Sequence, residues 1–594
     1  MTAAIGAPAA GGALATGEVI VVFGGTEVLG DGVDDGDSDW SALPPPAPEQ
    51  PATSSNAAIG RTVRISATVV VSPGYLPLPR ADLTPVRYGR GMHQHTVRVT
   101  VATGIVEGFT RDGVNRWRSI PYARPPVGPL RYRAPRPAEP WRGVRYCHGF
   151  ANCAPQERKY TITGLGKYQP MGEDCLTLNV VTPADSDAEQ GPLPVMLFVH
   201  GGAYILGSSA TVLYDGAALA RRGCVYVSVN YRLGALGCLD LSSLSTPEVT
   251  IDSNLFLRDL VMALQWVRDN ISAFGGDPES VTIFGESAGA QAVATLLAVP
   301  AAKGLFHQVI SESPAAGMVR SREVAAEFAD RFAGIIGARR QDAAHAVMQA
   351  SPGELVDALD ELISHGSRDV LGAFPAGPSF GDDYLPQDPV EAMARGTAHR
   401  VPLIVGNNAE EAKLFTRFLK LLPTTEPMIE ALLANAGEDT RDRITGAYPG
   451  YPAAAACVRL GGDFAFSSAA WQIGEAHSRH APTHVYRYDY APRTLHWSGL
   501  GATHATELLA VFDVYRSKFG SVLTAAGDQR SALRVSKDVQ RRWRSFSRTG
   551  VPGDDWPTYD ADTRAVMVFD RRSRVEIDPD PDRRTAWEGF TLAQ

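Results

Sequence analysis

The sequence predicts an α/β fold built on a mostly parallel sheet, and three features of the chain support this prediction. Several short runs are apolar on both faces and rich in β-branched residues, as central parallel strands are. Segments with the apolar spacing of an amphipathic helix lie between these runs. Strand and helix patterns alternate from about residue 96 onward, in the order typical of α/β proteins.

The individual elements are expected in the following order. Residues 96–101 alternate Thr, Val and Arg, which predicts a strand with one buried face. Residues 254–274 predict a helix, because apolar side chains recur every three or four positions and share one face. The predicted buried strands are residues 194–199, 224–229, 281–284 and 401–405, and a second apolar helix is predicted over residues 290–299.

Composition excludes several classes of function. The chain has 594 residues with 56 Lys and Arg against 65 Asp and Glu, so its formal net charge is −9. An acidic chain has no electrostatic basis for wrapping nucleic acid. No apolar run approaches the length of a membrane span. We therefore expect neither a nucleic-acid partner nor a membrane span, and the oligomeric state stays open.

The first part of the chain differs from the rest. Residues 1–60 hold eight acidic residues and no Lys or Arg, and are rich in Ala, Gly and Pro. Such a segment buries too little apolar surface to offset its ordering entropy, so residues 1–91 are predicted to be a disordered leader before a single domain at 92–594. Translation from Met92 is a hypothesis that an intact mass from the native host would test. The N-terminus lacks the features of an export signal, so a cytoplasmic location is expected, with secretion as the alternative.

A candidate nucleophile lies between a predicted strand and a predicted helix. Residues 285–289 read Gly-Glu-Ser-Ala-Gly, a G-x-S-x-G sequence that follows the strand at 281–284. A sharp turn from strand to helix exposes a serine Oγ and needs glycine on both sides, because the backbone is crowded there. The pattern predicts Ser287 as the nucleophile of a hydrolase.

A second motif directly follows the strand at 194–199. Residues 200–204 read His-Gly-Gly-Ala-Tyr, and backbone N–H groups can approach a substrate oxyanion closely only where side chains are small or absent. We therefore expect an oxyanion hole formed by the N–H groups of Gly202, Ala203 and Ala288.

With these motifs, the chain resembles the type-B carboxylesterases, the carboxylesterase and cholinesterase branch of the α/β-hydrolases, and in particular their bacterial para-nitrobenzyl-esterase-like members. The resemblance covers roughly residues 95–575. It implies an α/β-hydrolase fold with helical insertions that form an active-site gorge, a catalytic triad, and neither cofactor nor metal. The sequence blocks that carry it are Ser-Ile-Pro-Tyr-Ala at 119–123, Glu-Asp-Cys-Leu-Thr-Leu-Asn at 173–179, Asn-Tyr-Arg-Leu-Gly at 230–234 and Phe-Gly-Gly-Asp-Pro at 274–278.

The resemblance also indicates the other members of the triad. A serine hydroxyl needs a histidine base, and that base needs a carboxylate that fixes its tautomer. The family pattern Gly-x-Asn-x-x-Glu matches residues 406–411, which makes Glu411 the expected acid and Glu410 the alternative. The family pattern His-x-x-Glu-Leu points to His504 as the base, with His496 as the runner-up. Serine, acid and histidine then follow one another in the order of an α/β-hydrolase.

Further groups are implied by the same resemblance. Glu286 and Ser313 are expected beside the triad, with local hydrogen bonding as their alternative role. A disulfide is implied at Cys175, with Cys153 as the expected partner and Cys147 as the alternative. The remaining cysteines are expected to be core thiols: Cys224, Cys238 and Cys457.

The predicted function is hydrolysis of small to medium carboxylic esters through an acyl-enzyme, with a small-molecule ester and water as partners. Cholinesterases hold a quaternary ammonium group against a tryptophan, and residues 164–168 contain none, which disfavours choline esters. The alternatives are an amidase, a carbamate hydrolase or a lipase with the same triad, and a non-catalytic interaction domain.

Overall fold

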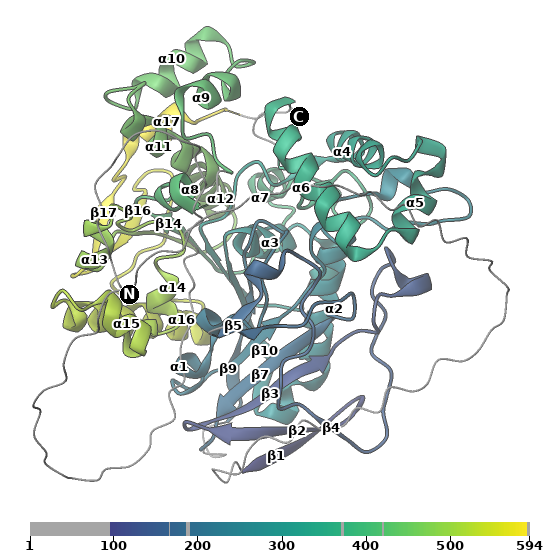
Figure 1. Ribbon diagram of the computed structural model, residues 1–594. Helices are drawn as coiled ribbons and strands as arrows, with labels where there is room; N and C mark the ends of the chain where they lie inside the picture. Colours follow the sequence, from purple (N-terminus) through teal and green to yellow (C-terminus); the bar gives the residue numbers. More distant parts are fainter. Residues whose placement is uncertain (1–94, 165–166, 186–190, 370–373, 419–420, 591–594) are drawn as a thin grey trace, which may run out of the picture. The chain divides into compact units, whose positions relative to one another are not determined.

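The computed structural model describes residues 95–590, except 165–166, 186–190, 370–373 and 419–420 (Figure 1). The predicted leader at residues 1–91 lies outside the described residues. None of the helices in the described part is long and apolar enough to cross a membrane.

The described part of the chain contains a sheet of thirteen strands, in the order β1, β2, β3, β7, β9, β8, β10, β11, β14, β15, β16 and β17, with β4 paired to β2. The strands from β9 to β16 in this order are all parallel, whereas β1, β2, β3 and β7 at one side and β17 at the other pair in antiparallel fashion. The strands of the sheet are β1 (Thr96–Val101), β2 (Gly104–Arg111), β3 (Val114–Pro121), β4 (Val144–Tyr146), β7 (Thr177–Pro183), β8 (Leu193–Val199), β9 (Val225–Val229), β10 (Gly276–Glu286), β11 (Gln308–Glu312), β14 (Leu403–Asn408), β15 (Thr483–Tyr488), β16 (Ala565–Phe569) and β17 (Arg574–Ile577). Two small separate sheets pair β5 (Ile162–Gly164) with β6 (Lys167–Tyr168), and β12 (Arg320–Ser321) with β13 (Ser379–Phe380).

Helices lie on both faces of this sheet (Figure 1). They are α1 (Ala217–Ala220), α2 (Leu255–Asn270), α3 (Ala288–Leu296), α4 (Arg322–Ile335), α5 (Ala343–Gln349), α6 (Pro352–Asp369), α7 (Pro389–Arg395), α8 (Lys413–Phe418), α9 (Glu426–Leu432), α10 (Glu438–Gly446), α11 (Ala454–Gly462), α12 (Ser468–Ser478), α13 (Arg493–Trp497), α14 (Leu508–Val511), α15 (Lys518–Leu523), α16 (Gln529–Thr549) and α17 (Pro581–Ala586). A π-helix, η10 (Asp463–Ser467), joins α11 to α12.

Two hydrophobic cores follow from the alternation of side chains along the strands. On β8, Val195, Leu197 and Val199 point to the core that α2, α3, α7 and α12 cover. Met196 and Phe198 point to the opposite core, which α1, α14 and α16 cover. A strand that is apolar on both faces is what two covered faces require, so the predicted α/β fold is confirmed.

Two further helical groups are inserted between strands. Helices α4 to α6 follow β11 and pack around a core of their own, and α8 to α11 follow β14 and form another core with η10. The gorge that such insertions were expected to form stays a prediction.

The predicted elements occur close to their expected bounds. The strand at 96–101 is β1, and the helix at 254–274 is α2 followed by the tighter turn η7 (Ile271–Phe274). Asn254 precedes α2 in a left-handed conformation, with φ of 50°. The strand expected from residue 401 starts only at Leu403, because Pro402 has no N–H for a sheet ladder.

Candidate active site

Ser287 lies at the turn between β10 and α3, at the carboxyl end of the parallel strands. Its φ of 60° and ψ of −124° are unusual for a residue other than glycine. The turn is held by a hydrogen bond from the Ser287 N–H to the Glu312 carbonyl, at 2.9 Å. This strained turn is the geometry that the G-x-S-x-G sequence predicted.

The glycines of the motif allow three segments to pack closely. A Cβ on Gly289 would lie 2.1 Å from the Val199 carbonyl oxygen, and a Cβ on Gly285 would lie 2.6 Å from the Gly289 carbonyl. The start of α3 therefore packs directly against the end of β8, where the second motif begins. Side chains at either position would push the serine turn away from that motif.

The loop after β8 turns back beside the serine. A Cβ on Gly201 would lie 2.9 Å from the Ser287 Cβ, so this loop and the serine turn are in direct contact. Gly202, Ala203 and Tyr204 all have positive φ, at 114°, 50° and 62°. The Gly202 carbonyl closes the loop by accepting from two N–H groups further along, each at 3.0 Å. Ala288 opens α3, and the first N–H groups of a helix have no partner within it.

Packing beneath the loop holds it in place. Tyr204 is fully buried, its carbonyl accepts from the Gly234 N–H at 2.8 Å, and its ring lies 4.9 Å from that of Phe256. The Tyr231 hydroxyl donates to the His200 carbonyl at 2.8 Å. The unusual backbone of the loop is thus set by tertiary contacts.

His504 and Glu411 form a buried pair on the other side of the site. His504 Nδ1 lies 2.6 Å from Glu411 Oε2, which fixes the tautomer with the proton on Nδ1. The carboxylate follows β14, and the histidine lies in the loop between α13 and α14. Burial alone would lower the pKa of His504, but the carboxylates of Glu286 and Glu411 outweigh it and raise that pKa well above its usual value.

Glu286 approaches the second ring nitrogen. Its Oε1 lies 2.9 Å from His504 Nε2, but without the alignment of a hydrogen bond. A negative charge at this distance favours the imidazolium form. Glu286 immediately precedes Ser287, so the same turn presents both the hydroxyl and this carboxylate.

Glu411 is oriented by two further hydrogen bonds. Its Oε1 accepts from the Ser313 hydroxyl at 2.7 Å and from the Asn408 N–H at 2.6 Å. Ser313 follows β11 with a φ of 56°, and its N–H donates to the Gly406 carbonyl at 2.7 Å. Each expected neighbour of the triad therefore contacts it: Glu286 contacts the histidine, and Ser313 contacts the carboxylate.

Two more carboxyl groups lie behind the pair, and sequence reasoning did not assign them. Glu507 accepts a hydrogen bond from the Asn408 side chain, and burial, together with the charges of Glu286 and Glu411, raises its pKa to about 8. Glu312 accepts from Trp543 Nε1 at 2.7 Å, and burial raises its pKa well above the usual range. Asn408 and Glu507 are the Asn and Glu of the two family patterns, so the motifs held this signal.

The alternative acid and the alternative base are not part of the buried pair. Glu410 pairs with Lys413, and His496 is exposed on α13. The implied disulfide is absent from the described residues: Cys153 and Cys175 are free thiols, as are the other cysteines. The Cys153 thiol donates to the Pro170 carbonyl at 3.6 Å. The thiols expected in the core are buried.

A mostly parallel sheet with helices on both faces, a serine at a strand-to-helix turn, and a buried acid and histidine on later loops define an α/β-hydrolase. Comparison with known proteins narrows this class. The model of the carboxylesterase family matches residues 95–587. The para-nitrobenzyl esterase of Bacillus subtilis (strain 168) is 35% identical over 492 residues, which cover 82% of this chain and 97% of that protein.

Other similar proteins support the same family. The fumonisin B1 esterase of Sphingopyxis macrogoltabida is 35% identical over 79% of this chain and 85% of its own length. A solved para-nitrobenzyl esterase structure superposes with a TM-score of 0.73 at 34% identity, covering 82% of this chain and 99% of the other. The chain therefore belongs to the carboxylesterase family, and it is a serine ester hydrolase.

Proposed function

We propose that Ser287, His504 and Glu411 are the catalytic triad of this carboxylesterase. The Ser287 Oγ attacks the ester carbonyl while His504 Nε2 takes its proton, and Glu411 stabilises the resulting imidazolium. His504 then gives the proton to the leaving alcohol. In the second half, the same nitrogen takes a proton from the water that attacks the acyl-enzyme, and returns this proton to the Ser287 Oγ as the carboxylic acid leaves.

The N–H groups of Gly202, Ala203 and Ala288 are proposed to hold the oxyanion of both tetrahedral intermediates. The contact between Gly201 and Ser287 supports this role, because it brings the loop to the atom that is attacked. Preorganised donors of this kind cost no reorganisation when charge develops on the oxygen.

The observation that carries the proposal is the 2.6 Å contact between His504 Nδ1 and Glu411 Oε2. It orients the imidazole with Nε2 directed toward Glu286, the residue that immediately precedes Ser287. Glu286 and Ser313 are proposed to be positioning residues, the first for the imidazole and the second for the carboxylate.

We propose small to medium esters of aryl or benzyl alcohols as the substrate class. The name of the bacterial relative, a para-nitrobenzyl esterase, supports this choice. The absence of tryptophan at residues 164–168 argues against choline esters. An amidase, a carbamate hydrolase and a lipase remain the competing activities.

A substrate panel tests this range. The wild-type enzyme is assayed with para-nitrophenyl esters from acetate to laurate and with the matching para-nitroanilides. We expect the highest kcat/KM for short and medium acyl chains and much lower values for the anilides. A maximum at the longest chain would indicate a lipase instead, and comparable anilide turnover would indicate an amidase.

We further propose that residues 92–594 form one catalytic domain and that the enzyme is cytoplasmic. The sequence of residues 1–17, which has no Lys or Arg and no clean apolar core, supports this location because it lacks the features of an export signal. Fractionation of native cells with an antibody to the enzyme tests this location, and recovery from the medium would contradict it.

A further inference from the structure

The π-helix η10 lies directly on the acid and histidine pair. The ring centroid of Phe466 lies 4.2 Å from that of His504, with 31° between the ring planes. A Cβ on Gly462, at the end of α11, would lie 3.1 Å from the Ala412 nitrogen and 3.6 Å from the Glu411 Cβ. The wide turn of η10 thus places an aromatic face against the imidazole. Single π-turns are rare within helices, and they often occur at functional sites.

Polar contacts hold this turn at both of its ends. Asp463, at its start, is buried and accepts from the Tyr448 hydroxyl at 2.8 Å and from the Ser467 hydroxyl at 2.9 Å. Ser467, at its end, accepts in turn from Asn407 Nδ2 at 3.1 Å. The residue after Asn407 donates its N–H to Glu411, so the same short segment of β14 touches both η10 and the acid.

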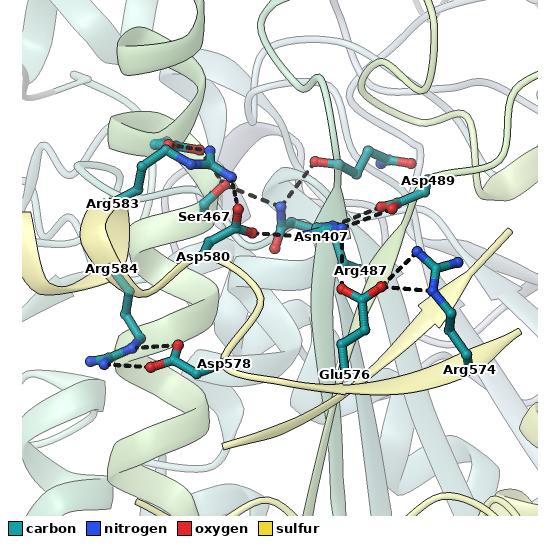
Figure 2. Close-up of polar contacts among 12 residues, drawn as sticks. Asn407, Ser467, Arg487, Asp489, Arg574, Glu576, Asp578, Asp580, Arg583 and Arg584 are labelled. Atoms are coloured by element: carbon teal, nitrogen blue, oxygen red, sulfur yellow. Dashed lines mark hydrogen bonds and ion pairs between the residues drawn. The ribbon is translucent and has the colours of Figure 1, made fainter. Parts of the chain in front are cut away.

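The counter-ion of Asp463 comes from the far end of the chain. Arg583 on α17 places Nη1 at 2.6 Å from Asp463 Oδ2, and Figure 2 shows its guanidinium reaching toward Ser467 and Asp580. Asp580 joins Arg583 to Arg487 on β15, where the second ion pair measures 2.7 Å. Helix α17 is therefore fixed to the sheet and to the π-helix by one continuous ion-pair network.

The neighbouring arginine provides an internal comparison. Arg584 points the other way from α17 and pairs with Asp578 at 2.8 Å (Figure 2). It also pairs with Glu588. Its contacts do not extend to η10. The two adjacent arginines thus both form ion pairs, but only Arg583 contacts the segment that carries Phe466.

We propose that α17 acts as a clamp that positions the catalytic histidine, a role that rests on the proposed function of His504. The ion pair between Arg583 and Asp463 holds the wide turn of η10 and so keeps the tilted Phe466 ring packed against the imidazole. This contact restricts rotation of His504, and the electron-rich face of the ring favours the imidazolium that forms during proton transfer. Arg583, Asp463 and Phe466 are positioning residues, since none of them reaches the reacting atoms.

The test compares Arg583→Met with the matched control Arg584→Met in the full chain. We expect Arg583→Met to lower kcat by about 10- to 100-fold with KM within about twofold, because small displacements of a catalytic group cost this much. It should also shift or broaden the low-field NMR resonance of the proton between His504 Nδ1 and Glu411. Arg584→Met should leave both readouts unchanged. Wild-type kcat and resonance in Arg583→Met, or equal losses in both variants, would overturn the clamp.

Arg583→Met alone leaves the buried Asp463 carboxylate without its counter-ion, and the variant can fail to fold for this reason. Further variants keep the test decisive in that case. Arg583→Met combined with Asp463→Asn removes both charges, and Phe466→Leu leaves the ion pair intact. We expect both to lower kcat and perturb the resonance, whereas Arg583→Lys restores most of the wild-type rate. Unchanged kcat in folded Phe466→Leu would overturn the proposal. If the clamp variants keep the wild-type kcat while Glu411→Gln is inactive, the clamp is rejected and the proposed triad is retained. An active Glu411→Gln would reject the triad itself.

Discussion

The two halves of the candidate active site are built in different ways. The half that holds Ser287 and the loop at 200–204, the backbone half, is shaped by backbone packing, because glycines let β8, β10 and α3 approach one another. The half that holds Glu411 and His504, the polar half, is shaped by hydrogen bonds to the Glu411 carboxylate from Ser313, which follows β11, and from Asn408 on β14, and by the charges of Glu286 and Glu411 on His504. We therefore expect the backbone half to be most sensitive to added atoms, and the polar half to the loss of hydrogen-bond and ion-pair partners.

The largest effect is expected at the nucleophile. Replacing Ser287 by Ala removes the attacking oxygen, so kcat should fall by about 10⁶-fold while the protein stays folded. Steady-state hydrolysis of an aryl ester, with circular dichroism as the control for folding, measures this loss. Retention of most activity would mean that the reaction does not pass through this serine.

A loss of about 10⁴-fold in kcat is expected for Glu411→Gln, because an amide cannot hold the imidazole in the productive tautomer. Glu410→Gln is the matched control, since Glu410 pairs with Lys413 and is the adjacent alternative in sequence. The same ester assay measures both variants. If Glu410→Gln were the more damaged variant, the assignment of the acid would be reversed.

In the backbone half, a single added carbon in the loop at 200–204 is expected to lower kcat. A Cβ on Gly202 would lie 2.2 Å from the Leu206 carbonyl oxygen, at a φ of 114°, so Gly202→Ala must displace the loop. We expect kcat to fall by roughly 10²- to 10³-fold, as when one oxyanion donor is removed. Gly304→Ala is the control, because Gly304 also has a positive φ, of 74°, but has no atom near the added carbon. Equal effects of the two variants on kcat would contradict this explanation.

The smallest effect expected is a change in pH dependence at the polar half. The Glu286 charge raises the pKa of His504, so the acid limb of kcat/KM should move to lower pH in Glu286→Gln. Glu286→Gln would then keep its kcat/KM at lower pH than the wild-type enzyme does. Glu507→Gln is the control: burial raises the pKa of Glu507 to about 8, so its carboxyl is already neutral on the acid limb and an amide resembles it. A limb that moves to higher pH in Glu286→Gln would be inconsistent with the geometry.

The backbone half could be predicted from the sequence almost completely. Its parts lie within two short motifs, each directly after an apolar strand, and glycine at fixed positions signals close approach. The predicted strand at 281–284 and the turn at Ser287 occur where expected because local chain geometry determines both.

The polar half could be predicted only in part. Glu411 and His504 were indicated by family patterns, and the structure brings them together. The contacts of Phe466 and Arg583 had no local signal, because Phe466 lies 38 positions before His504, Arg583 pairs with Asp463 far from it in sequence, and only tertiary packing brings each pair together. The implied disulfide between Cys153 and Cys175 stays a prediction, since both cysteines are unbonded in the structure and a pattern in sequence does not set the redox state of two thiols.

The most direct test of the proposed mechanism is to trap the acyl-enzyme. The enzyme is mixed with an aryl ester, quenched in acid within the first turnover, digested and analysed by mass spectrometry. We expect the mass of the acyl group on the peptide that contains Ser287, and no such adduct in Ser287→Ala. An adduct on another residue, or turnover of the ester by Ser287→Ala at the wild-type rate, would contradict the proposed mechanism.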